Sequence, residues 1–224
     1  MCFDAGAKLD TAAQVLMRHR LVMVDSRHQL AQFQRIQAIP VRVHRARHLF
    51  ELHDATVDEI AETAGVAKGT VYLYYHSKKD VYWAALKHGV AALYDELKNQ
   101  IDAAGTVEDK IYAFIATKIH FFELHRDFFR IYYSEFGNAF AHPTQVHEEF
   151  REMYTRQTKL LDEVLQEGVK QKSVRNIRRN SAAAAISDVT RGIITQRLMG
   201  WSKGNVNEEI DFIFDLIWKG IGNR

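Results

Sequence analysis

Residues 56–79 hold the side chains whose types and spacing point most clearly to a chemistry, namely contact with nucleic acid. The run from Lys68 to Tyr74 supplies an ammonium group, an aliphatic hydroxyl and two phenols, with no acidic residue among them. A short polar helix of this kind can enter the major groove of DNA without repelling the phosphates. The predicted contact face consists of Lys68, Gly69, Thr70, Tyr72 and Tyr74.

Two short helices joined by a tight turn are needed to present that face. Thr56 and Glu59 have the spacing of a capping box, which predicts a first helix over Val57–Ala64. Gly65 suits a turn that needs a positive φ, and Ala61 is small enough for a steep crossing with a second helix over about 67–75. Ile60, Val66 and Val71 are predicted to fill the small core beneath the pair. A helical hairpin buried in a bundle is the alternative, but it would not expose a lysine, a glycine and two tyrosines together.

Helical periodicity continues through the rest of the chain, and β-type alternation is almost absent. Pro40 suits the first turn of a helix over Val41–Leu52, and Ser77 is predicted to cap a long helix over about 78–102. Gly105 and Thr106 mark a break before a helix whose apolar face runs from Ile111 to Phe122. Further helices are predicted from the aromatic segment 128–140 and over 143–172, 180–200 and 206–220. The fold class is therefore all-α, with about nine helices, three of them short and early.

Positive charge is concentrated near the N-terminus, although the formal net charge of the chain is only +2. Seven arginines lie between Arg18 and Arg47, where Asp25 is the single acidic residue. Residues 1–39 are therefore either a basic arm that binds a polyanion or a solvated leader, ordered as an extra helix or disordered. We divide the chain into this leader, a DNA-binding domain over 40–87 and an effector-binding and dimerisation domain over 88–224.

The composition excludes several classes of protein. No apolar run approaches the roughly 20 residues that a membrane helix needs, and charges at Lys8 and Asp10 interrupt any signal peptide. The single cysteine, Cys2, excludes an internal disulfide and a multi-cysteine metal site, which suits a reducing cytoplasm. We therefore expect a cytoplasmic, nucleoid-associated protein without a membrane partner.

Ten aromatic side chains gather within residues 112–140. Such a stripe packs as core in most proteins, but polar residues interspersed with it could also fix an apolar ligand in a pocket. We take as a hypothesis that a flat, mainly apolar effector is contacted by some of Phe114, Phe121, Phe122, Tyr132 and Phe136.

The histidines do not indicate a metal site. His120 and His125, like His142 and His147, are five residues apart and so leave a common helix face, whereas zinc sites on one helix use a spacing of four. No serine–histidine–aspartate ordering, glycine-rich phosphate loop or paired-carboxylate signal is present either. We predict no metal, no cofactor and no enzymatic activity.

The last two predicted helices have apolar faces wide enough to require a cover. Small residues in 180–200 let a partner helix approach closely, and two such helices from each subunit would form a four-helix dimer interface. Packing within one subunit is the alternative. The residues predicted at the interface are Ile186, Val189, Ile193, Leu198, Phe212 and Leu216.

The segment 56–86 resembles the DNA-binding domain of TetR/AcrR-family transcriptional regulators. The matching motifs are Thr-Val-Asp-Glu-Ile-Ala from Thr56, Ala-Gly-Val-Ala-Lys-Gly-Thr-Val-Tyr from Ala64, and Tyr-His-Ser-Lys-Lys-Asp from Tyr75. Beyond residue 86 only length and helix order match. The resemblance implies a homodimer on a palindromic DNA operator, an effector pocket in the C-terminal helices, and repression of nearby genes.

The same resemblance assigns roles within the motif. Lys68, Thr70 and Tyr72 fall where bases and phosphates are contacted, and Tyr74 falls beside the DNA backbone. Thr56 and Lys79 fall where family members bind phosphates, whereas Tyr75 is expected in the core of the DNA-binding domain. One departure is the connection from Leu52 to Thr56, which is shorter than usual in the family and lacks glycine; another is the unusual richness of Val41–Leu52 in arginine and histidine.

Together these observations favour a repressor that a small apolar or aromatic effector releases from its operator. The sequence does not encode the sign of regulation, so an activator remains an alternative. A second alternative is an architectural DNA-binding protein without an effector, for which the basic leader would be essential. A third is an enzyme with an appended DNA-binding head, which would turn over the bound molecule.

Overall fold

A computed structural model of the chain describes residues 56–141 and 148–222. Within these ranges the chain forms helices and no strand, which confirms the all-α prediction. The leader 1–39, the helix predicted over Val41–Leu52 and the shortened connection before Thr56 lie outside the described residues. The helices are α4 Val57–Ala64, α5 Lys68–Tyr74, α6 Lys78–Ala103, α7 Val107–Leu124, α8 Arg126–Ala141, α9 Glu148–Lys170, α10 Arg179–Leu198 and α11 Val206–Ile221.

Side chains cap several of these helices at the positions that the sequence predicts. Thr56 accepts a hydrogen bond from the Glu59 backbone, and Ser77 accepts one from the Asp80 backbone, each within a complete capping box. The side chains of Thr106 and Asn205 also accept hydrogen bonds from backbone N–H groups at the starts of α7 and α11. Because these side chains satisfy donors that a helix start leaves free, they fix where each helix begins.

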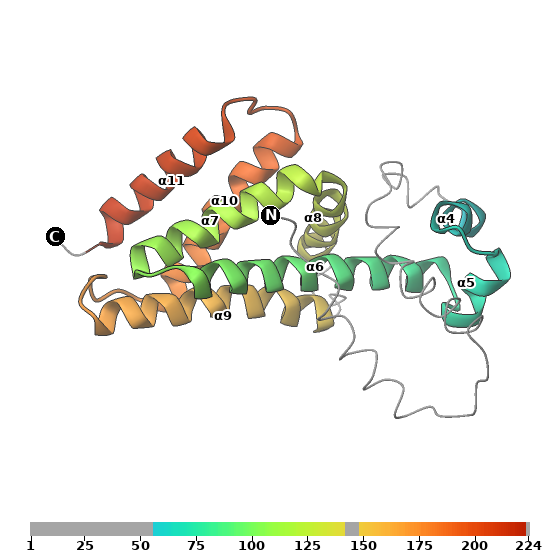
Figure 1. Cartoon of the computed structure of the whole chain (residues 1–224), viewed down its shortest axis with the longest axis horizontal. Coiled ribbons are helices and arrows are strands. Elements are labelled where there is room, and N and C mark those ends of the chain that lie inside the picture. Colours follow the sequence, from blue (N-terminus) through green and yellow to red (C-terminus); the bar gives the residue numbers. More distant parts are fainter. Residues whose placement is uncertain (1–55, 142–147, 223–224) are drawn as a thin grey trace.

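Helix α6 joins the two parts of the molecule (Figure 1). Its first turns place Val81 and Ala85 in a small core with α4 and α5, which together form the head. Its later turns place Leu86, Leu93 and Leu97 in the main core of the body, which contains α7 to α11. At 26 residues the helix is roughly 39 Å long, so a single rigid element connects head and body.

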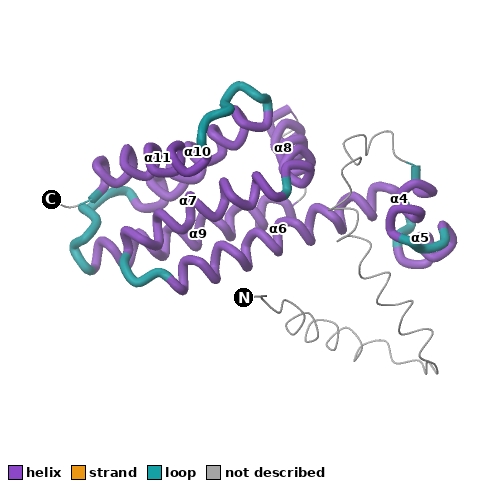
Figure 2. The backbone as a smooth tube through the Cα atoms, turned by 45° about the horizontal axis from the view of Figure 1, so that its top comes forward, coloured by secondary structure: helices purple, strands orange, loops and turns teal. Residues whose placement is uncertain are grey.

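Helix α7 is the centre of the body and contacts α6, α9, α10 and α11 (Figure 2). Ile111, Phe114 and Ile115 are fully buried in it, as are Ile119 and Phe122. Helix α8 crosses the direction of α6 and α7 near the end of the body that faces the head (Figure 1). The apolar face predicted from Ile111 to Phe122 is therefore confirmed as the middle of the core.

The later helices differ from the predicted bounds mainly at their ends. The described part of α9 begins at Glu148, and the predicted start at Pro143 lies outside the described residues. The helix ends at Lys170, two residues early, in a turn where Lys172 has φ 61°. Helix α10 is displaced by one or two residues to Arg179–Leu198, and α11 extends to Ile221.

Candidate functional site

The turn between α4 and α5 has the geometry that Gly65 predicts. Gly65 adopts φ 67° and ψ 37°, and its N–H donates to the carbonyl oxygens of Ala61 and Glu62. Only glycine enters this left-handed region at little cost. Ala61 is 2% exposed, consistent with close contact between the two helices.

A compact core fixes the two helices of the head. Ile60 and Val71 are buried against Val81 and Ala85 of α6, with Val66 partly buried beside them. Tyr75 packs against this core, which confirms its predicted position, and burial raises the pKa of its phenol. The orientation of α5 therefore depends on apolar packing against the start of α6.

The contact face of α5 is exposed except at one residue. Tyr72 and Tyr74 are each 45% exposed, Lys68 is exposed, and a Cβ added at Gly69 would meet no atom within 4 Å. The expectation of an exposed Thr70 is wrong, because this residue is only 8% exposed. Thr70 lies beside Val71 on the buried side of α5, which is only seven residues long. Successive residues of an α-helix are rotated by about 100°, so a residue next to the contact face can lie on the buried side.

Two charged groups of the head are already engaged in the free protein. The Lys68 Nζ donates to Asp58 Oδ2 at 2.6 Å across α4 and α5, and this hydrogen bond raises the pKa of Lys68. The Thr56 backbone N–H donates to Glu59 at 2.7 Å and lowers the pKa of that carboxyl group. Lys79 is exposed at the start of α6. A phosphate that reaches Lys68 must therefore compete with Asp58.

Four of the five predicted effector contacts belong to one aromatic region of α7 and α8. Phe114 and Phe122 are fully buried, Tyr132 is 3% exposed and Phe121 is half-buried. The Phe121 and Phe122 rings lie 6.3 and 5.5 Å from the Phe129 ring, which lies 6.1 Å from the ring of Tyr132. The side chain of Phe136, the fifth predicted contact, lies outside the described residues.

Polar side chains within the same core were missed by the sequence analysis. Lys118 is 5% exposed, and Gln157 and Ser187 are each 2% exposed. A signal for Lys118 was present, since it follows Phe114 by four residues and precedes Phe122 by four, on the apolar face of α7. A lysine at such a position is almost never fully buried without a reason.

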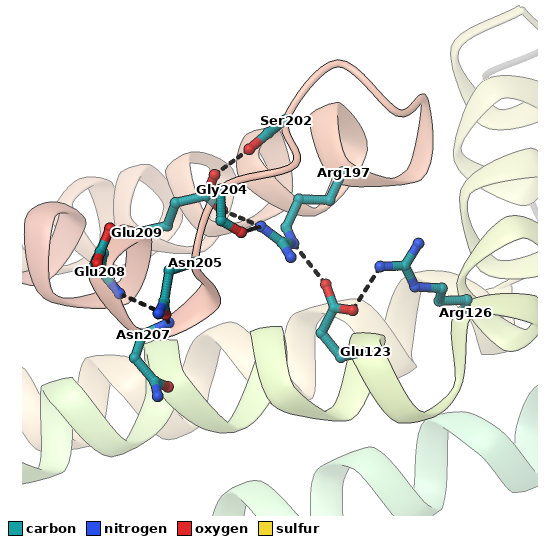
Figure 3. A network of polar contacts seen from close by, with 9 residues as sticks. All are labelled: Glu123, Arg126, Arg197, Ser202, Gly204, Asn205, Asn207, Glu208 and Glu209. Carbon is teal, nitrogen blue, oxygen red and sulfur yellow. Dashed lines mark hydrogen bonds and ion pairs between the residues drawn. The ribbon is translucent and has the colours of Figure 1, made fainter.

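A second polar network joins the far end of α7 to α10 and α11 (Figure 3). The Arg197 Nε donates to Glu123 at 2.6 Å, and its NH1 donates to Glu209 at 2.7 Å and to the Gly204 carbonyl at 3.1 Å. Arg126, at the start of α8, also donates to Glu123 at 2.6 Å. Burial opposes the charge of Glu123, but the two arginines outweigh it and lower its pKa.

The six residues predicted at a dimer interface divide into two groups. Val189 is 41% exposed, Phe212 is 69% exposed and Leu216 is 62% exposed. Ile186 is buried in the core of its own subunit, and Ile193 and Leu198 are half-buried against that core. Helix α10 therefore directs part of its apolar surface inward, and the exposed face is narrower than the sequence suggests.

Two family models match the chain. The model of bacterial regulatory proteins of the tetR family matches residues 43–85, and that of the tetracyclin repressor-like C-terminal domain matches residues 104–195. Together they cover more than half of the chain. The chain belongs to the TetR family.

A curated relative is the fatty acid metabolism regulator protein of Bacillus subtilis (strain 168). This TetR-family chain is 32% identical to it over 59 residues, which are 26% of the chain and 30% of the relative. The match thus spans less than a third of the relative's length.

Solved structures of other TetR-family regulators share the fold. The fatty acid degradation regulator FadR of Bacillus halodurans is 23% identical, with a TM-score of 0.66 over 83% of this chain and 96% of that one. FadR of Bacillus subtilis, solved in complex with stearoyl-CoA, is 19% identical, with a TM-score of 0.61 over the same shares of the two chains. At these identities the likeness concerns the fold.

Two further properties concern only the described part of this TetR-family chain. None of its helices has both the length and the apolarity to cross a bilayer. No group of three histidine, cysteine, aspartate or glutamate side chains is placed there to hold a metal ion.

Proposed function

We propose that this TetR-family protein is a dimeric repressor that binds a palindromic operator and is released from it by a small effector with an apolar or aromatic body. The observation that carries the DNA-binding part is the exposed face of α5, held on a rigid head by the core around Ile60 and Val71. A helix fixed in this way can be inserted into the major groove as a unit.

DNA contacts are assigned to residues that the head presents at its surface. Tyr72 and Lys68 read or position the DNA from α5, with Gly69 allowing close approach and Tyr74 lying beside the backbone. Thr56 and Lys79, both exposed, bind phosphates. Thr70 stays among the proposed DNA contacts, at the base of the contact face, although it is only 8% exposed.

Control by an effector follows from the way α6 joins the head to the body. Leu93 and Leu97 pack in the same core as Phe114 and Phe122, while Val81 packs in the head. An effector that rearranges the body core would therefore tilt α6 and change the separation of the two heads. Binding then favours a spacing that no longer matches successive major grooves, roughly 34 Å apart, by a shift of populations.

The expected dimer uses the exposed apolar residues of α10 and α11, namely Val189, Phe212 and Leu216. No reaction is proposed for the protein, which is expected to act on DNA in the cytoplasm. The fatty-acid regulators among its relatives make acyl compounds such as stearoyl-CoA the first effectors to test.

Selection of bound sequences from a random DNA pool tests the proposal. The expected result is a palindrome with half-sites about one helical turn apart, from which an apolar effector displaces the protein in a gel-shift titration. An asymmetric or degenerate sequence pool would overturn the dimeric operator model. Loss of binding on removal of residues 1–38, with no compound releasing the DNA, would identify an architectural protein instead. A transcription assay on the selected operator distinguishes repression from activation.

A further inference from the structure

Polar side chains from four helices meet inside the apolar body, at a position that the DNA-binding function does not use. The charges of Lys118 on α7 and of Asp188 and Arg191 on α10 act on one another, and Arg191 also acts on Tyr132 and Tyr133 of α8. Gln157 of α9 lies close enough to Tyr132 to influence the pKa of its phenol. We call Lys118, Tyr132, Gln157, Ser187 and Arg191 the polar cluster.

Buried atoms of this cluster are left without hydrogen bonds. Neither Nε2 nor Oε1 of Gln157 makes a hydrogen bond of normal geometry within the described part of the chain, although its amide lies within reach of the Tyr132 phenol, and the Ser187 Oγ also makes none. An unsatisfied buried polar atom destabilises the folded state, so folded proteins rarely contain several together. Ser187 precedes Arg191 by four residues, which places both on one face of α10.

The charges of the cluster leave positive charge in its interior. The carboxylate of Asp188 is ion-paired with Arg191 at 2.9 Å and accepts a hydrogen bond from Tyr154 at 3.2 Å. Lys118 lies deeper, with its Nζ 5.3 Å from the centre of the Phe114 ring. Burial and the charge of Arg191 lower the pKa of Lys118 to about 8, so the side chain is still mostly charged at neutral pH. Burial raises the pKa of Tyr132 and Tyr133, which keeps both phenols neutral.

Exposure falls from one side of the cluster to the other. The side chain of Asp188 is 49% exposed and that of Arg191 is 25% exposed, whereas residue Lys118 is only 5% exposed. Aromatic rings flank the buried side, where Phe128 lies 5.6 Å from Tyr132. A molecule that fits this arrangement has one anionic group and an apolar body.

We propose that the effector is an amphipathic carboxylic acid whose carboxylate binds Lys118 and Arg191 and accepts hydrogen bonds from Gln157 and Ser187. The inference rests on the proposed function and gives its effector a chemical class. A carboxylate satisfies the unpaired donors and neutralises the buried ammonium group, whereas an ordered water molecule satisfies donors without changing the charge. The apolar body of the acid lies against the aromatic rings of α7 and α8.

Matched pairs of ligands test the charge requirement. Oleate is compared with oleyl alcohol, and biphenyl-4-carboxylate with biphenyl-4-methanol, by isothermal titration of the full chain. The acid of at least one pair is expected to bind and its alcohol to bind roughly tenfold to a hundredfold more weakly, the range of a charge-assisted hydrogen bond. Oleoyl-CoA is titrated beside oleate, because its acyl group carries no free carboxylate; tighter binding of the thioester would contradict the proposal.

Variants then locate the binding site. Lys118→Met is expected to weaken binding of the acid by a similar factor, whereas Lys98→Met, which removes an exposed lysine of α6 that is ion-paired at 2.6 Å, leaves it unchanged. Gln157→Met is a second variant that removes an unsatisfied group and should fold well, while it weakens the acid more than the alcohol. Unchanged affinity in both cluster variants, or binding of no acid at all, would overturn the proposal.

Gel shifts with the selected operator separate this inference from the proposed function. An acid that binds through Lys118 but leaves the DNA bound would support the polar cluster and contradict the effector-released repressor. Release of the DNA only by neutral apolar compounds would support the repressor and contradict the carboxylate site. Release by the acid in the native protein, lost in Lys118→Met, would support both.

Discussion

Lys68 and Asp58 form an exposed ion pair at 2.6 Å, on the part of the head that is proposed to meet DNA. Lys68→Ala is expected to weaken DNA binding to a similar extent for all sequences and to reduce the slope of log affinity against log salt by about one, because one phosphate contact is lost. Asp58→Ala should have the opposite effect, since it releases Lys68 and removes a negative charge. Fluorescence anisotropy at several salt concentrations measures both. Equal weakening by the two variants would show that the pair acts by holding the head together.

Lys118 makes a separate prediction for the protein without ligand. Because burial and Arg191 lower its pKa from 10.5 to about 8, its charge destabilises the folded state by roughly 3 kcal/mol below pH 8, where it is protonated in both states. Asp188 offsets part of this effect and is included in that pKa. Lys118→Met is therefore expected to be more stable than the native chain at pH 7.

The difference in the free energy of unfolding between Lys118→Met and the native chain should narrow as the pH rises, because the folded state loses the Lys118 proton before the unfolded state does. By about pH 9.5 roughly 2 kcal/mol of it is expected to have disappeared. Urea unfolding of both proteins at the two pH values measures this. A constant difference would show that the effect comes from packing of the methionine rather than from charge.

At the scale of single residues, sequence spacing predicted the helix caps and the turn. It did not predict which polar side chains are buried. Thr56, Ser77 and Gly65 act on backbone groups a few residues away, so their roles follow from spacing. Thr70 is polar yet buried, because the packing of α5 on the start of α6 decides which face is covered. Lys118 is charged yet buried for a similar reason, since five helices contact α7.

Among the elements, the end of α9 packs closely against the start of α7 and the loop that follows α9. A Cβ at Gly168 would lie 2.6 Å from the Val174 Cγ2 and 2.7 Å from the Val107 Cγ1. Gly168→Ala is therefore expected to destabilise the fold by about 1–3 kcal/mol, in spite of the better helix propensity of alanine. A Cβ added at Gly137 in α8 would meet no atom within 4 Å, so Gly137→Ala should instead stabilise by roughly 0.5–1 kcal/mol. Thermal unfolding of both variants decides whether close packing or propensity dominates.

Helix order and most helix bounds could be predicted from the sequence because periodicity and caps are local. The depth at which each helix lies could not, since it depends on partners distant in the chain. Helix α10 shows this: Ile186 and Val189 belong to one apolar stripe in the sequence, but one is 3% and the other 41% exposed. The network of Glu123, Arg197 and Glu209 likewise joins residues from three helices that no spacing rule connects.

At the scale of the whole molecule, the exposed apolar residues of α11 support the proposed dimer. Phe212 and Leu216 are 69% and 62% exposed, on a helix whose adjoining face carries the buried Ile210 and Ile213. A face of this kind in contact with water favours association, because burial of a large apolar side chain is worth about 1.5–3 kcal/mol. Phe212→Glu combined with Leu216→Glu is therefore expected to produce a monomer in sedimentation equilibrium.

The same variant tests whether DNA affinity depends on the dimer. Binding to a full palindrome should fall to the level of a half-site, because two linked heads no longer bind together, whereas half-site binding itself should not change. Leu124, the last residue of α7, is 79% exposed. Leu124→Glu is therefore the matched control for adding a charge in place of an exposed leucine. A variant that remains dimeric would exclude α11 from the interface. A monomer that still binds the full palindrome with native affinity would show that each head recognises its operator alone.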